Sequence, residues 1–434
     1  MMKTRILFVI FAVSAGASVQ AQVTANSELK QLINQSFTYF PKVKEVENTV
    51  VTAQDKVNLT GLNKMPEVTG TATYAYVKPK IVLPFPIGPG GAIENFQFAP
   101  VHNGNASVNA TYTLLDFGRL KANVEKSKDE LQYAQHNVAA VKNQLANQVA
   151  NIYYNIIYIK EAIGIQDSVL QFLKENKAVV EAKYKNGDAL KFDVVNLQAN
   201  IDAEQNRKVD LENALQKQYT LLDYTTGVQK NNGNGFDFDI ALADVEAALA
   251  TAQATNLDFL LAKDKIKQAQ SDVAIAKLGD KPIVGMLAAA GVKNGYVPDV
   301  NNFKFNYNAG IGISIPIYNA GKTKQQVKIA QNIVHQQELA EQTLTSTYRK
   351  DIEQAYTDIR SNLERIKNTE GQIEQAKYAE QLASVRFKNG VGTNIELVNA
   401  STNVQRAELT RLQYQYQLCI AKVELARLMG YQYW

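Results

Sequence analysis

The chain has 434 residues, of which 46% are hydrophobic and 20% charged, with a net charge of +4 at pH 7. Lys3 and Arg5 account for two of these positive charges, so the rest of the chain is nearly neutral and has no basic excess for binding nucleic acid. Its single cysteine, Cys419, excludes an intramolecular disulfide and a multi-cysteine metal site.

Residues 1–21 have the pattern of a secretory signal peptide. Lys3 and Arg5 precede the apolar run 6–13, and residues 19–21 supply a cleavage site before Gln22. A buried N-terminal helix is the alternative interpretation. Beyond this segment, no apolar stretch reaches the roughly 18 residues that a membrane helix needs. We therefore expect a secreted chain that could cross a membrane only as strands.

Four short segments alternate between apolar and polar residues, and they form two pairs. The first pair lies within about 66–115, as strands near 68–77 and 107–114. The second lies within about 282–317, as strands near 283–292 and 305–317. Each is close to the 9–11 residues of a tilted membrane strand with one apolar face. A half-buried strand of a soluble sheet is the alternative.

These strands are predicted to form two hairpins with unequal loops. The loop 78–102 holds five prolines, whereas the loop 293–302 is short. Long loops lie outside the cell in bacterial barrels. Four strands cannot close a barrel, and an open edge in lipid leaves backbone groups without hydrogen bonds. Since the smallest bacterial barrels have eight strands, at least two chains must contribute, and the strand count leaves two, three or more chains open.

All ten prolines lie within 41–100 or 282–316, which leaves long tracts free to form helices. The tracts 119–183 and 322–386 are each followed by Lys-Asn-Gly, and later runs end at Gly227 and Gly430, where glycine suits a helix C-terminus. About 65 residues give a helix of roughly 95 Å. The narrow apolar seams of these tracts fit either an antiparallel coiled coil or the wall of a water-filled tube.

The sequence also contains an internal repeat, because residues 113–227 match 316–430 at an offset of 203 residues without a gap. The copies extend to about 22–230 and 249–434, joined by an inter-repeat segment near 231–248, so residues 22–434 are expected to form one architectural unit. Two copies are too few for a solenoid, which needs roughly three or more. We expect a pseudo-two-fold chain that functions when several copies assemble.

The residues that begin and end the long tracts resemble those of the TolC family of outer-membrane efflux proteins. They are the strand-to-helix junctions Leu115–Arg119 and Tyr318–Lys322, and the turns Tyr184–Gly187 and Phe387–Gly390, each followed by an acid six residues after its glycine. The resemblance covers nearly all of the chain after the signal peptide. It rests on the order, spacing and duplication of these motifs.

The resemblance implies a mainly α fold with membrane strands. Four strands per chain would contribute to a trimeric 12-stranded β-barrel in the outer membrane of a Gram-negative bacterium, continued by a long α-helical barrel through the periplasm. The inter-repeat segment would form an equatorial belt. The homotrimer would contact outer-membrane lipid and dock to a periplasmic adaptor and an inner-membrane pump, as a passive exit duct without cofactor, metal or catalysis.

The resemblance also assigns roles to residues of this chain. Asp193 and Glu396 match acids at the tip constriction, although acids are common at helix N-termini in any case. Phe387, Gly392 and Asn399 stand where the family pattern has a tyrosine, an arginine and a second acid, so closure through packing or a leakier gate is expected. The adaptor-docking residues are Lys185, Asn186, Gly187, Lys388, Asn389 and Gly390. Gly118 and Gly321 would allow the turn from strand to helix.

Other functions have little support from the sequence. The three histidines, His102, His136 and His335, are scattered, and no nucleotide-binding or hydrolase motif is present. The competing interpretation from another class is a soluble periplasmic coiled-coil adaptor or scaffold, which shares the helices but leaves four membrane-length strands unexplained. The sequence predicts neither the cargo nor the class of pump.

Overall fold

The computed structural model describes residues 23–87 and 92–434, so the predicted signal peptide lies outside the described residues. These residues form two compact units, one of residues 23–40, 143–256 and 348–434 (the first unit) and one of residues 41–87, 92–142 and 257–347 (the second unit). The helices are α1 (Ser27–Tyr39), α2 (Pro41–Leu62), α3 (Arg119–Lys185), α4 (Lys191–Thr226), α5 (Val245–Thr255), α6 (Leu257–Lys277), α7 (Lys322–Lys388) and α8 (Asn394–Leu428). The strands are β1 (Glu67–Tyr76), β2 (Val82–Ile87), β3 (Ala92–Gln97), β4 (His102–Leu115), β5 (Ile283–Lys293) and β6 (Lys304–Ser314).

The two long helices are confirmed, since α3 and α7 each contain 67 residues. Both run without a proline, which would remove an intrahelical hydrogen bond and distort the helix. Gly227, at φ 74°, caps α4, and Gly430 adopts the same φ just after α8. The glycines predicted to terminate the second helix of each repeat therefore have the left-handed conformation that a helix C-terminus favours. No helix in residues 23–87 and 92–434 is long and apolar enough to cross a membrane.

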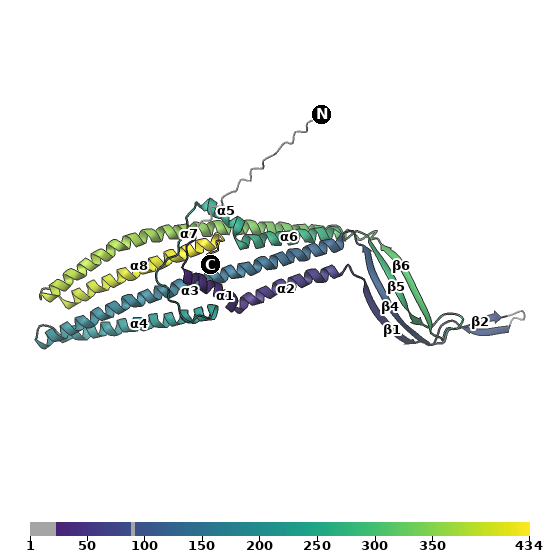
Figure 1. Ribbon diagram of the computed structural model, residues 1–434, viewed down its shortest axis with the longest axis horizontal. Coiled ribbons are helices and arrows are strands. Elements are labelled where there is room, and N and C mark those ends of the chain that lie inside the picture. The colour runs from purple at the N-terminus through teal and green to yellow at the C-terminus, as the bar shows by residue number, and fades with distance from the viewer. Residues whose placement is uncertain (1–22, 88–91) are drawn as a thin grey trace, which may run out of the picture. The chain divides into compact units, whose positions relative to one another are not determined.

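The second unit contains an antiparallel sheet in the order β1-β4-β5-β6 (Figure 1). Both predicted hairpins are present, as the pairs β1–β4 and β5–β6, and β4 pairs with β5 to join them into one sheet. The prediction of a loop over the whole of 78–102 was incomplete, because β2 and β3 form a separate two-stranded ribbon there. Pro84 and Pro86 are two residues apart in β2, so their missing N–H groups lie on the same side of the strand, where an edge strand tolerates them.

The first unit has a buried aromatic core around the middle of α3. Tyr153 and Tyr154 are fully buried, and their rings pack edge to face with centroids 5.1 Å apart. The Tyr153 hydroxyl donates to Glu28 Oε2 at 3.3 Å, and the Tyr154 hydroxyl donates to Asp237 Oδ1 at 3.2 Å. The core thus fixes both α1 and the segment that links the two repeats.

This core gives the protein an expected weakness at alkaline pH. Burial raises the pKa of Tyr153 and of Tyr154 above the ordinary tyrosine value, and Glu28 adds to the effect at Tyr153. Because the folded pKa lies above the unfolded one, the resulting stability is complete below about pH 10 and is lost as the pH rises further. Denaturant unfolding between pH 8 and 11 should therefore show falling stability. Tyr154→Phe should make the fall shallower, and an equally steep fall would contradict this explanation.

Candidate functional site

Two helical hairpins end the first unit. Lys185 is the last residue of α3 and is followed by Asn186 and Gly187, and Lys388 is the last residue of α7 and is followed by Asn389 and Gly390 (Figure 1). All six are exposed, and the two glycines have φ of 88° and 75°. The Lys-Asn-Gly motifs therefore form the ends of both hairpins, in the left-handed conformation that glycine adopts with least strain.

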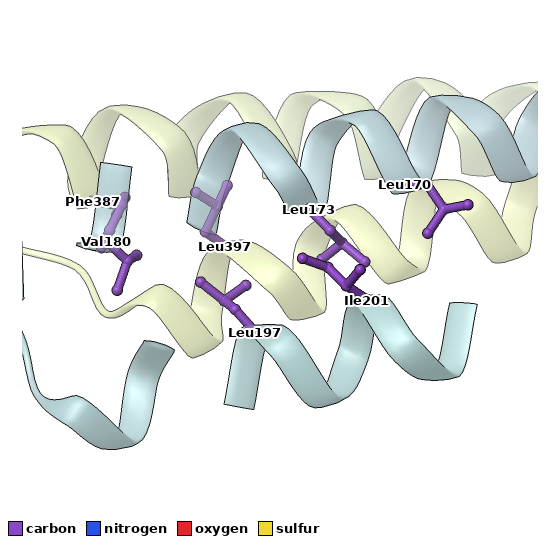
Figure 2. Packing of buried hydrophobic residues seen from close by; sticks show 7 residues of the cluster. All are labelled: Leu170, Leu173, Val180, Leu197, Ile201, Phe387 and Leu397. Carbon is purple, nitrogen blue, oxygen red and sulfur yellow. The ribbon is translucent and has the colours of Figure 1, made fainter. Parts of the chain in front are cut away.

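An apolar cluster holds the two hairpins together near these turns. Figure 2 shows that α3 contributes Leu170, Leu173 and Val180, α4 contributes Leu197 and Ile201, α7 contributes Phe387, and α8 contributes Leu397. Val180 and Leu197 have no exposed surface. Each helix presents one narrow apolar stripe to this cluster, so four largely polar helices share a core. We refer to these seven residues as the tip cluster.

Phe387, which the sequence analysis placed at the gate, lies in the tip cluster and is only 8% exposed. The Lys183 ammonium is 4.3 Å from the centre of its ring and donates to its backbone carbonyl at 3.0 Å. A cation over an aromatic face is attracted by about 0.5–2 kcal/mol. Sequence reasoning missed Lys183, because its partner is 204 residues away in the chain.

The two candidate aperture acids occupy equivalent places near the starts of α4 and α8. The Asp193 carboxylate accepts a hydrogen bond from the Leu190 backbone N–H at 3.2 Å, so it caps its own helix. Glu396 has a half-exposed side chain whose Oε2 lies 3.8 Å from Nη2 of Arg386. Each acid thus has a local structural partner.

The remaining gate positions differ from one another. Asn399 is exposed on α8. A side chain at Gly392 would begin 2.9 Å from Cβ of Arg386, so there is little room for one. Arg386 itself supplies a guanidinium on this side of the turn, with Nη2 3.4 Å from the Val391 carbonyl oxygen. An arginine is therefore present beside Glu396, six residues before the position that the sequence pattern indicated.

The two strand-to-helix junctions repeat the same backbone conformation. Phe117 and Gly118 have φ of 55° and 93°, and Ala320 and Gly321 have φ of 54° and 76°. Asp116 caps the first junction by accepting from the Gly118 N–H at 3.0 Å, and Asn319 does the same for Gly321 at 3.1 Å. Two successive left-handed residues turn the chain sharply at each junction, and glycine occupies the second position both times.

The strand register places apolar residues from all four strands on one face of the sheet. Directly paired residues share a face in an antiparallel sheet, and one row is Val68–Ala110–Ala288–Ala309. Phe305, Tyr307, Ile311 and Ile313 extend this apolar face along β6, and all four are exposed. The opposite face carries the row Thr69–Asn109–Ala289–Asn308. Aromatic residues gather near the loop end of the apolar face, as in the girdles of membrane strands.

No group of acidic, histidine or cysteine residues in the described ranges could hold a metal ion. The arrangement is suited instead to forming a wall. An exposed apolar sheet face of membrane length, followed twice by a helix of about 100 Å, defines a subunit of an outer-membrane channel with a helical extension.

Comparison with known proteins agrees with this class. The sequence matches the outer membrane efflux protein family over residues 18–228 and 248–431, and the chain belongs to that family. It is 23% identical over 344 residues to the pyoverdine export outer membrane protein OpmQ of Pseudomonas aeruginosa, covering 76% of this chain and 70% of OpmQ. It is 19% identical over 424 residues to the cation efflux system protein CusC of Escherichia coli K12, covering 93% of this chain and 87% of CusC.

A crystal structure of CusC superposes with a TM-score of 0.78 at 17% identity, over 94% of this chain and 93% of that one. The fold predicted from the sequence, mainly α with membrane strands and the architecture of TolC-family channels, is thereby confirmed. The protein is an outer-membrane efflux channel component, located in the outer membrane of a Gram-negative bacterium. The soluble scaffold interpretation is not favoured, since the family is one of transport channels.

Proposed function

We propose that three copies of this chain assemble into one exit duct, with a 12-stranded barrel in the membrane and a helical tube below it. The duct carries out no chemistry of its own. It docks through its hairpin ends to a periplasmic adaptor, which connects it to an inner-membrane pump. The single observation that carries this proposal is the open sheet with an exposed apolar face.

The sheet has two free edges within one chain, because β1 pairs with β4 and β6 pairs with β5 at the ends of the strand order. Each unpaired backbone group in lipid costs several kcal/mol. Pairing β6 of one copy with β1 of the next satisfies both edges and closes the sheet. Three copies give twelve strands, above the minimum of eight that is known for bacterial barrels.

The internal repeat also supports a closed ring of copies, through helices of the second unit. There α3 contacts α6 through Lys126, whose Nζ is 2.5 Å from Asp272 Oδ1, and His136, whose Nδ1 is 2.6 Å from Asp264 Oδ2. The 203-residue shift carries Lys126 to Ile329 and His136 to Leu339, which are both exposed on α7.

The side of α7 that corresponds to the α6-facing side of α3 is therefore exposed, and it carries the apolar residues Ile329 and Leu339. Helix α2 also exposes large apolar residues, namely Val51, Leu59 and Leu62. Its other side contacts α3, where the hydroxyls of Thr60 and Ser127 are 3.0 Å apart. In a ring of copies, α2 of the next chain would cover α7 and bury apolar surface from both helices.

We assign the exposed turns at 185–187 and 388–390 to adaptor docking, because they are the free ends of both hairpins. Asp193 and Glu396 are assigned to the aperture with Asn399, and three copies would bring six carboxylates together there. Such a ring would attract cations. The segment 231–248 is assigned to the equatorial belt, since Asp237 is held on α3 by Tyr154.

The assembly is tested by measuring the detergent-corrected mass of protein extracted from outer membranes, using light scattering on a sizing column. We expect a particle of three chains that resists extraction by alkaline carbonate and requires detergent. A monomer released without detergent would contradict both the barrel and the duct. A stable particle of two chains would retain the membrane strands and overturn the trimer.

A further inference from the structure

The last row of residues that crosses all four strands of the sheet, at its loop end, contains two opposed lysines. The register places one residue from each strand side by side, in the order of the strands: Thr73, Asn105, Lys293 and Lys304. We call these four residues the lysine row. Because β5 ends at Lys293 and β6 begins at Lys304, the row lies where the second hairpin passes into its loop (Figure 1).

The lysine row lies on the face of the sheet opposite the apolar face. Val292 and Phe305, the neighbours of the two lysines along the strands, are paired with each other on the apolar face. Successive residues of a strand point to opposite faces, so Lys293 and Lys304 point away from it. In the proposed barrel this second face lines the water-filled interior, and the loop end of the strands lies outside the cell. The two lysines therefore belong to the outer mouth of the duct.

Lys293 and Lys304 are paired without an acid beside them. In the described part of the chain neither ammonium forms an ion pair. Lys293 Nζ instead lies 5.0 Å from the centre of the Tyr296 ring, and the acid of the loop, Asp299, accepts from Asn302. Like charges at directly paired positions are destabilising. An anion bound between the two lysines would offset this repulsion.

The loop between the two lysines is anchored to β4, which limits how far they can separate. Asn294 is buried, and its Nδ2 donates to the His102 carbonyl at 2.6 Å while its Oδ1 accepts from the Gly104 N–H at 2.9 Å. The Gly295 N–H donates to the Val300 carbonyl at 2.8 Å and closes the loop. The strand ends therefore cannot relieve the repulsion by moving apart, and the two charges stay together.

Elsewhere the interior face of the sheet carries almost no charge. Within β1, β4, β5 and β6, all of which are described, its only other ionisable residue is Glu67, which pairs with Thr111 at the opposite end. Glu67 is six positions from Thr73 on β1, or about 20 Å at 3.3 Å per residue. This distance exceeds the Debye length, which is about 8 Å at physiological ionic strength. Glu67 therefore does not neutralise the lysines.

A closed barrel of three copies would bring six ammonium groups together at its outer end. The row would also supply uncharged hydrogen-bond donors, the hydroxyl of Thr73 and the side-chain amide of Asn105. Rings of lysine or arginine side chains confer preference for anions on a pore. A water-filled mouth with walls of low dielectric constant strengthens such a field and raises the local concentration of the attracted ion.

We propose that Lys293 and Lys304 of the three copies form an anion-binding ring at the outer mouth of the duct. The ring takes multivalent anions that carry phosphate or carboxylate groups, and it opposes the entry of cations from outside the cell. This inference rests on the proposed function, because a mouth exists only in a closed barrel. It also gives the two ends of the duct opposite charge, since Asp193 and Glu396 are assigned to the aperture at the other end.

The test is block of single-channel current by inorganic triphosphate, using the detergent-purified full chain in planar bilayers with potassium chloride as the conducting salt. Triphosphate should block each channel from one chamber only, because the ring lies at one end and the aperture acids at the other end repel this anion. In the double variant Lys293→Gln/Lys304→Gln the half-blocking concentration should rise about tenfold, which corresponds to about 1.4 kcal/mol. Higher salt should weaken the block of wild type, since it screens the charges.

Two variants control for effects other than the charge of the ring. Lys293→Arg/Lys304→Arg keeps every cation and should be blocked like wild type. Lys78→Gln removes a lysine from the same end of the sheet but from the other face, where Lys78 Nζ lies 5.4 Å from the centre of the Tyr76 ring. It should leave the block unchanged. The particle mass of each variant in detergent should be that of wild type.

The outcomes distinguish the ring from the duct. If wild type conducts but triphosphate does not block it, or blocks the glutamine double variant at the same concentration, the ring is overturned and the duct stands. Equal loss of block in the arginine double variant or in Lys78→Gln would also overturn the ring, because neither change removes its charge. If wild type forms no channel at all, the proposed function fails, and the ring fails with it.

Discussion

Replacing Ala309 with arginine is expected to prevent the chain from assembling in the outer membrane. Ala309 is the sixth of the eleven residues of β6, and it lies on the apolar face in one row with Ala288, Ala110 and Val68. Arginine at the middle of a lipid-facing strand costs about 2–4 kcal/mol. Because a trimer would contain three copies of the variant strand, the total cost would be three times as large. Membrane fractionation followed by light scattering should find little or no assembled particle.

Asn308→Arg is the matched control for this prediction. Asn308 is the adjacent residue of β6, and it is paired with Ala289 on the opposite face of the sheet. In a closed barrel that face lines the water-filled interior, so an arginine there stays solvated and assembly should be retained. Equal loss in both variants would indicate a general intolerance of β6 to substitution. Normal insertion of Ala309→Arg would show that this face does not meet lipid.

The strands could be predicted from the sequence because alternation in β6 is nearly complete, from Phe305 to Ile313. In β5 it is weaker, since Leu287 and Ala289 lie on the mainly polar face. The β2–β3 ribbon was missed because prolines are ordinarily read as strand breakers. Periodicity identifies strands in which one side is buried or faces lipid. A free two-stranded ribbon has no such side, so alternation does not reveal it.

The site was predictable where a local motif determines the conformation. The Lys-Asn-Gly turns needed only short-range information, because a glycine at positive φ ends a helix in the same way in both repeats. The contacts between the two hairpins depend on which of their faces meet. Lys183 and Arg386 occupy equivalent positions in the repeats, yet Lys183 crosses to the other hairpin and Arg386 does not. Only the tertiary packing distinguishes them.

Leu197→Ala is expected to loosen the hairpin ends while leaving the assembled particle intact. Leu197 is fully buried in the tip cluster (Figure 2). Truncating a buried leucine to alanine costs about 2–5 kcal/mol, through lost burial and the cavity that remains. The cost falls on the first unit, whereas the proposed contacts between chains in β1, β6, α2 and the 322–347 part of α7 belong to the second unit. Hydrogen exchange should therefore accelerate at residues 184–193 and 387–396 without a change in particle mass.

Val195→Ala is the control, because Val195 lies two residues earlier on α4 and is 58% exposed. It should leave exchange at the hairpin ends unchanged. Leu197→Ala weakens the attraction between all four helices, so exchange should rise in both hairpins. If exchange at residues 184–193 and 387–396 kept the wild-type rate in Leu197→Ala, the tip cluster would not be what holds the four helix ends together.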